Sequence, residues 1–307
     1  IAMLLKAKPV DSIQFMRKMV LDGSNVSGFQ RTAIIATDGI METSKGIVRI
    51  PTICLEEEAA KKINSNETTT TYRLDRLGIP LIEIATDPSI KDPEHAKETA
   101  SMLGMILRST GKVKRGLGTI RQDINLSMKG MPRVELKGFQ DLKSIPKVIE
   151  TEIKRQLSAK EHTAEVRKVN PDFTTTFLRP MPGSSRMYPE TDHPSIPITK
   201  ELINSIKIPE LLTEKAIKLE KEFNISPDLA LEIIEEEQYF RLLVNRFKNI
   251  SPSMIIHSII ELPKEVKTRF NYNATSKELE ELLDMLNSDR ITKDALIKIL
   301  EDKAVGK

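Results

Sequence analysis

The stretch Gly46-Ile-Val-Arg-Ile-Pro-Thr-Ile-Cys54 is rich in β-branched residues, a composition typical of a β-strand. A second run, Arg133-Val-Glu-Leu-Lys137, alternates apolar and polar side chains as a half-buried strand does. Between them, residues 92–110 have an acidic first turn, apolar side chains at helical spacing and Gly111 just beyond, which predicts a helix. This mixture predicts an α+β fold with an antiparallel sheet for residues 1–199.

The β-branched alternation disappears from Glu201 onward, and segments rich in Leu, Ile, Glu and Lys predict amphipathic helices. These segments are 213–222, 228–248, 276–287 and 293–302. Five prolines between residues 179 and 199 exclude a regular helix or central strand there, so we expect a long irregular connection. Residues 200–307 are therefore predicted to be an all-α domain.

Composition and charge restrict the class of protein. The chain has 307 residues, enough for two domains, and a net charge of only +3 although 30% of its residues are charged. Any nucleic-acid-binding surface must be local, because residues 112–155 are basic whereas residues 210–240 are acidic. Cys54 is the only cysteine, which excludes internal disulfides, and no apolar run is long enough to cross a membrane. We expect a soluble, cytoplasmic protein.

Residues 112–123 combine cations, glycines and a carboxylate. Backbone amides at Gly116 and Gly118 can approach an anion closely, and Asp123, expected at the end of a strand, can hold Mg²⁺. The cations expected to bind nucleotide phosphates are Lys112, Lys114, Arg115 and Arg121. Composition alone favours a solvent-exposed hairpin here, and both interpretations stay open.

Two further groups of carboxylates are candidates. Glu56 and its two following glutamates end the first strand, and they are either site carboxylates or the acidic start of a helix at residues 59–63. Glu83 lies within Pro80-Leu-Ile-Glu-Ile-Ala85. It is either paired or metal-bound in an apolar environment, or it lies on the solvated face of a half-buried strand.

Glu135 and Lys137 share one face of their predicted strand. With Asp123 on a neighbouring strand, that face can hold a metal and a nucleotide phosphate, although a simple ion pair is the alternative. The four histidines lack the spacing of a helical zinc site, which argues against a metallohydrolase. Cys54 has no histidine nearby in sequence, so a structural thiol is favoured over a nucleophile.

Several of these motifs together resemble the B/E family of tRNA-dependent amidotransferase subunits, and within it the archaeal E-type branch. The residues that carry the resemblance are 22–25, 28–32, 72–85, 111–125, 133–140 and 186–192. The resemblance implies a cradle-shaped catalytic domain followed by a helical domain that runs into the start of a tRNA-binding tail domain.

The implied activity is that of a carbon-nitrogen ligase. ATP and Mg²⁺ would serve to phosphorylate the γ-carboxylate of Glu-tRNA(Gln), and ammonia from an asparaginase-like partner, the D-type subunit, would then displace the phosphate to give Gln-tRNA(Gln). The implied assembly is a heterotetramer that binds tRNA. A carboxylate is a poor electrophile until its oxygen leaves as phosphate, which is the physical reason for using ATP.

The resemblance also implies roles for individual residues. Glu56 matches a metal-binding glutamate, Asp123 matches a carboxylate of the catalytic cavity that also binds the metal, and Glu83, Glu135 and Lys137 match positions lining that cavity. Cys54 stands where the B-type members of the family have a histidine.

Other features of the family are not found in the sequence. We find no N-terminal strand of the type that supplies metal ligands, and we expect a missing inserted domain near residues 160–167. Residues 1–8 look helical but lack an N-terminal cap, which suggests a piece of a longer chain. Two competing functions remain: a non-catalytic tRNA-binding scaffold, and a metal-dependent phosphotransferase acting on a small metabolite.

Overall fold

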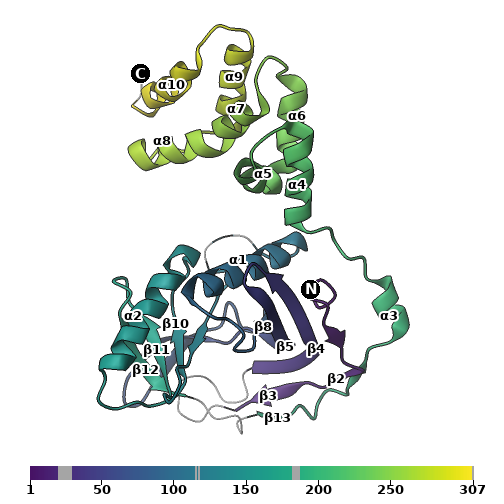
Figure 1. The fold of residues 1–307 in the computed structure, drawn as a ribbon, viewed down its shortest axis with the longest axis vertical. Helices are drawn as coiled ribbons and strands as arrows, with labels where there is room; N and C mark the ends of the chain where they lie inside the picture. The colour runs from purple at the N-terminus through teal and green to yellow at the C-terminus, as the bar shows by residue number, and fades with distance from the viewer. Residues whose placement is uncertain (20–29, 115, 117, 182–186, 306–307) are drawn as a thin grey trace. The chain divides into compact units, whose positions relative to one another are not determined.

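The computed structural model describes residues 1–19, 30–114, 116, 118–181 and 187–305. The chain divides into two compact units, Ile1–Pro209 and Glu210–Lys307 (Figure 1). The first unit combines strands with helices, while the described part of the second unit contains helices and turns. The predicted α+β class is confirmed.

The larger sheet of the first unit is antiparallel and has the order β13-β3-β4-β5-β8, with β1 also paired to β4. Its centre is a long hairpin of β4 (Gln30–Thr43) and β5 (Gly46–Glu57), which β8 (Pro80–Ala85) extends. The other strands are β1 (Lys8–Pro9), β3 (Met16–Lys18) and β13 (Met187–Pro189). Val48 and Ile50 of β5 are fully buried, and the strand predicted from the β-branched residues 46–54 is confirmed.

The N-terminal segment packs directly on β4 at Gly39. A Cβ at Gly39 would lie 3.1 Å from both the Leu5 carbonyl oxygen and the Ala7 Cβ, so the close approach requires glycine. The Ile40 N–H donates to the Leu5 carbonyl at 2.8 Å. The helix predicted for residues 1–8 is wrong, because residues 2–6 form turns that are held against this strand instead.

A second sheet has the order β12-β11-β10-β9. Its strands are β9 (Ile124–Leu126), β10 (Val134–Lys137), β11 (Glu165–Val169) and β12 (Thr175–Pro180), and only the β10–β11 pair is parallel. The helices α1 (Pro93–Ser109) and α2 (Ile145–Ser158) cover one face of it (Figure 1). The apolar core beneath them consists of Val134, Leu136, Phe139, Ile145, Val148, Ile149 and Val169. The opposite face of this sheet is free to carry polar side chains.

Helix α1 has the ends that its sequence predicts. The Asp92 side chain accepts a hydrogen bond from the His95 N–H at 2.9 Å, and Gly111 beyond the last turn has a left-handed φ of 65°. Helix α2 and the 3₁₀ turn before it (Leu142–Ser144) were not predicted. Its apolar residues are at helical spacing, and three basic and two acidic residues lie among its fourteen.

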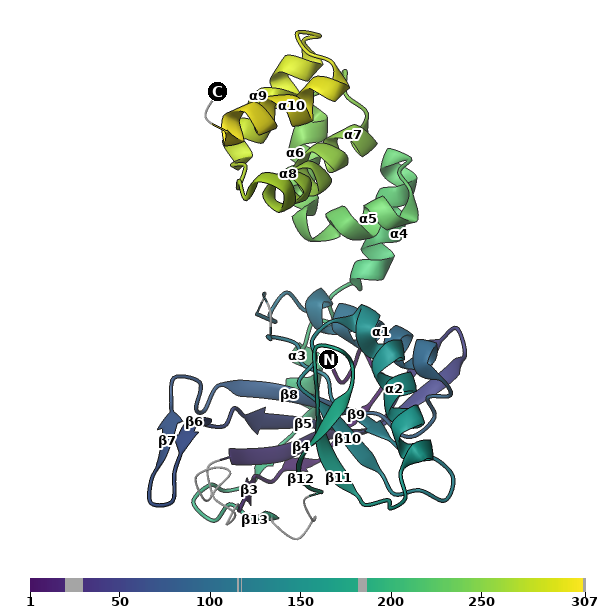
Figure 2. The same ribbon diagram turned by 90° about the vertical axis from the view of Figure 1, so that its left-hand side faces the viewer.

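Two local predictions are wrong. Residues 59–63 do not form a helix, because β6 (Lys61–Ser65) begins there and pairs with β7 (Thr70–Arg73) in an exposed hairpin (Figure 2). Residues 119–123 form turns and irregular backbone, so Asp123 directly precedes a strand instead of ending one. The remaining elements of this unit are β2 (Ser12–Ile13), β14 (Ile196–Pro197) and α3 (Lys200–Ser205).

The second unit packs its helices around two apolar clusters, one that includes Phe240 and Leu283 and another that includes Val266 and Leu300. The helices are α4 (Leu212–Phe223), α5 (Pro227–Ile233), α6 (Glu237–Arg246), α7 (Pro252–Ile256), α8 (Leu262–Phe270), α9 (Ser276–Asn287) and α10 (Lys293–Ala304). The sequence did not predict α7 and α8, whose prolines stand in their first turns, where proline is tolerated. No described helix has the length and apolarity needed to cross a bilayer.

Candidate active site

Glu56 lies at the end of β5 with little exposure to solvent, its side chain being 8% exposed. It forms an ion pair with Lys18 of β3, and Gln30 Nε2 donates to its second oxygen at 3.4 Å. A carboxylate this deeply buried needs a cation or a proton. Lys18 was not identified from the sequence, because no local pattern links β3 to the end of β5.

Glu83 lies on the same side of this sheet as Glu56. Its partner across the strand pair is Cys54, two residues before Glu56, so the three side chains share one face. Burial and the negative charge of Glu56 raise the pKa of Glu83, and a hydrogen bond between the two carboxyl groups raises it further. Burial, Glu83 and Glu56 likewise raise the pKa of the Cys54 thiol. Glu83 is exposed to solvent, so it lies on a solvated face beside Glu56 rather than in an apolar environment. The raised pKa makes Cys54 a thiol of low nucleophilicity.

The second sheet contributes Lys137, Glu135 and Asp123. Lys137 Nζ lies 2.5 Å from Asp123 Oδ2 and 2.7 Å from Glu135 Oε1. Burial would lower the pKa of Lys137, but its hydrogen bonds to the two carboxylates outweigh burial and raise it. The predicted face of β10 is confirmed, since Val134 and Leu136 are buried on the other side.

An electrostatic effect links the two sheets through Lys137 and Glu83. The charge of Lys137, on the second sheet, lowers the pKa of Glu83, on the first. Such an effect requires the two groups to be near each other. Glu83 is therefore within electrostatic range of Lys137. The five residues predicted for the cavity and metal, Glu56, Glu83, Asp123, Glu135 and Lys137, are called the charged site below.

The remaining glutamates after β5 are held by arginines. Glu57 accepts from Arg31 Nη1 at 3.0 Å, and Glu58 accepts from Arg76 Nη2 at 3.0 Å and Arg121 Nη2 at 2.7 Å. Arg121, predicted to bind a nucleotide phosphate, is therefore engaged in an ion pair with Glu58. Since β6 follows this run, its charges do not complement a helix.

Glu190 is a buried carboxylate that the sequence reasoning left unassigned. It pairs with Arg17 and with Arg31, whose Nε lies 2.9 Å away, although its side chain is only 3% exposed. These bonds keep the pKa of Glu190 low although burial alone would raise it. Glu190 thereby ties the segment after β13 to β3 and β4. Glu190 lies within the motif at residues 186–192, and this position is the feature of the sequence that could have identified it.

The loop at residues 112–123, which was predicted to bind nucleotide phosphates, contains a turn at its two glycines. Gly116 and Gly118 have φ angles of 108° and 78°, which favour glycine, and the Thr119 hydroxyl donates to the Gly116 carbonyl at 2.8 Å. Lys112 and Lys114 are exposed beside this turn. Arg115 lies outside the described residues.

The carboxylate pairs of the site have the chemistry that Mg²⁺ prefers. In the described ranges, with gaps at 20–29, 115, 117 and 182–186, no three His, Cys, Asp or Glu side chains group closely enough to hold a metal unaided. Mg²⁺ in phosphate-using enzymes, however, is commonly held by one or two carboxylates together with substrate phosphates. The Glu56–Glu83 pair, which shares a face and a hydrogen bond, fits that donor set, as does Asp123.

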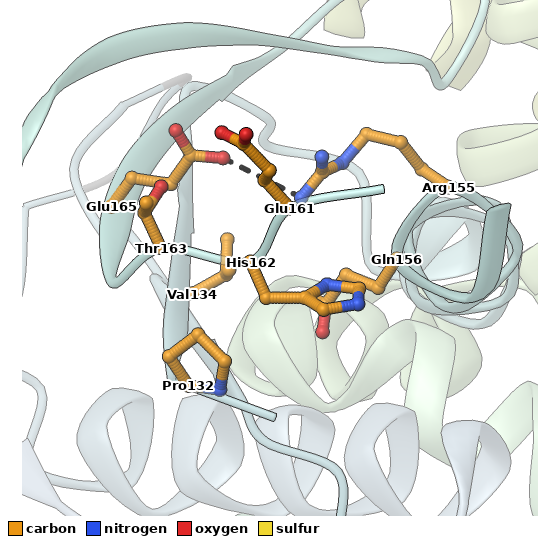
Figure 3. Close-up of a pocket in the computed structure, with 8 residues that line it drawn as sticks. All are labelled: Pro132, Val134, Arg155, Gln156, Glu161, His162, Thr163 and Glu165. Carbon is orange, nitrogen blue, oxygen red and sulfur yellow. Dashed lines mark hydrogen bonds and ion pairs between the residues drawn. The ribbon is translucent and has the colours of Figure 1, made fainter. Parts of the chain in front are cut away.

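A small cavity elsewhere in the first unit is not this site. It lies beside the end of α2, where Arg155 and Gln156 approach residues 161–165 (Figure 3). Its volume of about 10 Å³ is space for about one water molecule. Val134 lines it, which places it on the helix-covered side of the second sheet.

Comparison with known proteins agrees with the resemblance seen in the sequence. Residues 1–204 match the family described as "GatB/GatE catalytic domain". The E subunits of glutamyl-tRNA(Gln) amidotransferase from Thermococcus gammatolerans and Pyrococcus furiosus are each 34% identical over 99% of this chain and 71% of their own length. The protein of the same name from Pyrococcus abyssi is 45% identical over 99% of this chain and 45% of its own.

The first of these alignments spans 449 residues, more than this chain contains, so that relative has residues without a counterpart here. The match to the family covers both sheets and every residue of the charged site. The chain belongs to the GatB/GatE catalytic domain family.

Proposed function

We propose that this chain is the component of a tRNA-dependent amidotransferase that activates the glutamyl group of Glu-tRNA(Gln) with ATP and converts it to Gln-tRNA(Gln). Support comes from the relatives, which are named as E subunits of glutamyl-tRNA(Gln) amidotransferase. The observation that supports the proposal is the electrostatic effect on Glu83 of Lys137, which itself pairs with Asp123 and Glu135 on the other sheet. Carboxylates and ammonium groups in one site are the parts that phosphoryl transfer needs.

The proposed reaction has two stages. The γ-phosphoryl group of ATP passes to a γ-carboxylate oxygen of the tRNA-bound glutamate, and ADP leaves. Ammonia then attacks the acyl carbon, inorganic phosphate leaves with that oxygen, and the amide of Gln-tRNA(Gln) remains. The second stage is easier than direct attack on a carboxylate, because phosphate is a far better leaving group than an oxide.

In this scheme the residues of the chain position charge. Glu56, Glu83 and Asp123 would hold Mg²⁺, which would neutralise phosphate oxygens when bound. Lys137 holds Asp123 and Glu135 in place, and it lies near enough to Glu83 to favour the ionised carboxylate. Lys18 forms an ion pair with Glu56, and its charge also lowers the pKa of Glu83.

We infer that ammonia comes from an asparaginase-like partner protein, the D-type component of such a complex. Cys54 is the only cysteine of the chain, and its raised pKa disfavours the thiolate that a glutamine-hydrolysing nucleophile requires. A single cysteine also suits a reducing cytoplasm, which is where we place the complex.

The decisive experiment measures ATP hydrolysis with Mg²⁺ by the full chain and its partner, with and without Glu-tRNA(Gln). We expect hydrolysis to require the charged tRNA and to be lost in Asp123→Asn, while tRNA binding persists. Asp302→Asn, an exposed aspartate of α10, is the matched control and should behave as wild type.

Three results would count against the proposal. Normal hydrolysis by Asp123→Asn would remove this residue from the site. No hydrolysis by the wild-type complex, combined with intact tRNA binding, would favour the non-catalytic scaffold instead. Equal hydrolysis with and without tRNA would favour a phosphotransferase acting on a small metabolite.

A further inference from the structure

The site-facing side of the second sheet carries two cations that the reaction scheme does not use, Lys168 and Arg179. Lys137 of β10 is in register with Lys168 of β11, and Glu135 is in register with Val166, whose partner on β12 is Arg179. Side chains in register on neighbouring strands project from the same face. Lys168 and Arg179 therefore share the face of Lys137 and Glu135, away from α1 and α2.

The direction of Lys168 is further limited by Gly138. A Cβ at Gly138 would lie 3.6 Å from Lys168 Cγ, so the lysine stem passes over this glycine, which follows Lys137 directly. Gly138 has a φ of 88°, a conformation that side chains rarely adopt. The stem of Lys168 thus begins beside the end of β10, next to Lys137.

These two cations differ from the others around them in having no carboxylate partner within the described residues. Asp123 and Glu135 are already held by Lys137. Arg155 and Arg167, on the helix-covered side, are paired with Glu152 and Glu165. By contrast, Arg179 Nε is buried and has no hydrogen-bond acceptor among the described atoms.

A buried guanidinium N–H without an acceptor is costly, and a ligand anion can supply what is missing. The acceptor must be planar or forked to suit Arg179, and it must carry enough charge to engage Lys168 as well. Phosphate oxygens meet both conditions. Arg121 of the predicted loop differs in this respect, because it already has a carboxylate partner in Glu58.

We propose that Lys168 and Arg179 form a subsite for the polyphosphate chain of a nucleoside triphosphate, on the face shared with Lys137. This assignment rests on the proposed function. The nucleotide is favoured over the tRNA backbone because the subsite adjoins the carboxylates Asp123 and Glu135. Those groups repel a bare phosphate backbone, but with a divalent cation they complement a metal-bound triphosphate.

The test is binding of ATPγS with Mg²⁺ to the full chain and its partner, measured by calorimetry with and without Glu-tRNA(Gln). Variants are Lys168→Gln and Arg179→Gln, with Arg179→Lys as the conservative form and Lys154→Gln, on the exposed side of α2, as the matched control. Each glutamine variant should weaken ATPγS binding about ten- to a hundredfold, the effect of losing a charged hydrogen bond. The affinity for tRNA should stay unchanged.

Because Lys168 is exposed, Lys168→Gln should fold normally, and this can be checked by its thermal unfolding. Unchanged ATPγS affinity in folded Lys168→Gln and Arg179→Gln would overturn the subsite, even if tRNA-dependent ATP hydrolysis proves the proposed function right. Weaker tRNA binding with unchanged ATPγS affinity would overturn it too, in favour of a backbone contact. If ATPγS binding depends on both cations but charged tRNA never stimulates hydrolysis, the subsite stands and the proposed function falls.

Discussion

Lys137 Nζ lies 2.5 Å from Asp123 Oδ2, a contact that joins β10 to the residue just before β9. The same ammonium group holds Glu135 at 2.7 Å and also favours the ionised form of Glu83 on the other sheet. One cation therefore balances carboxylates from both sheets, and its removal should disturb the whole site rather than one bond.

Replacing Lys137 with glutamine should lower charged-tRNA-dependent ATP hydrolysis about a hundredfold, the usual effect of removing one preorganised charged group. Without the ammonium, the pKa of Glu83, already raised by burial and by Glu56, should rise further. Ionised Glu83 would then require a higher pH, so the acidic limb of the pH–rate profile should move upward. A profile with its limb unmoved would argue that Lys137 does not act on Glu83. Lys154→Gln is the control.

The Cys54 thiol provides a separate probe of the same carboxylates, because the chain has no other cysteine. Burial raises the pKa of Cys54, and the charges of Glu83 and Glu56 raise it further. Glu83→Gln removes one charge, so the thiol pKa should fall and a maleimide reagent should react several times faster near a pH of about 8. Glu150→Gln, an exposed change on α2, should not alter the rate. Equal rates in wild type and Glu83→Gln would place Glu83 away from Cys54.

Local patterns predicted much of the fold. The alternation in β5 and β10 and the capped ends of α1 depend on neighbours in sequence, so the corresponding elements could be assigned from the sequence alone. Helix α2 was not predicted, although its apolar residues are at helical spacing. The strand expected before Asp123 was wrong because glycine turns shape that segment, and Gly116 and Gly118 both take left-handed φ angles.

The candidate site was predictable only where a short spacing fixed it. Glu135 and Lys137 are two residues apart on a strand, so their common face followed from the sequence. The partners of Glu56 and Glu58 could not be predicted from the sequence, because Lys18 and Arg121 come from distant segments that only the tertiary fold brings close. The same holds for Arg179, whose place on the site face depends on strand register.

The buried network around Glu152 should be decisive for the stability of the first unit. Glu152 is fully buried and accepts hydrogen bonds from Arg155, Gln156 and the Thr175 hydroxyl. Glu152→Ala should lower the free energy of unfolding by about 3–5 kcal/mol, because it removes the buried one of the two carboxylates that Arg155 and Arg167 share, leaving them Glu165 alone. Denaturant unfolding measures this loss. A cost below about 1 kcal/mol would mean that solvent compensates these arginines.

Glu278 should make the second unit sensitive to acid. Hydrogen bonds from the Thr275 N–H and the Tyr272 hydroxyl lower the pKa of Glu278 from 4.5 to about 2. A carboxyl group whose pKa is lowered by folding stabilises the protein above its unfolded pKa, and this stabilisation is lost as the pH falls from about 4.5 to about 2. Because the side chain remains in contact with water, we expect a contribution of about 1–2 kcal/mol at neutral pH.

Glu278→Gln should remove this contribution and flatten the dependence of the unfolding free energy on pH in the acid range, measured on the full chain by helical circular dichroism. Glu281→Gln, an exposed change on the same helix, is the control and should keep the wild-type slope. An unchanged slope in Glu278→Gln would show that its carboxylate is not held by the capping box that begins α9. We expect a flatter slope instead, because in the wild-type protein protonation of Glu278 weakens the hydrogen bond from the Thr275 N–H that fixes the start of the helix.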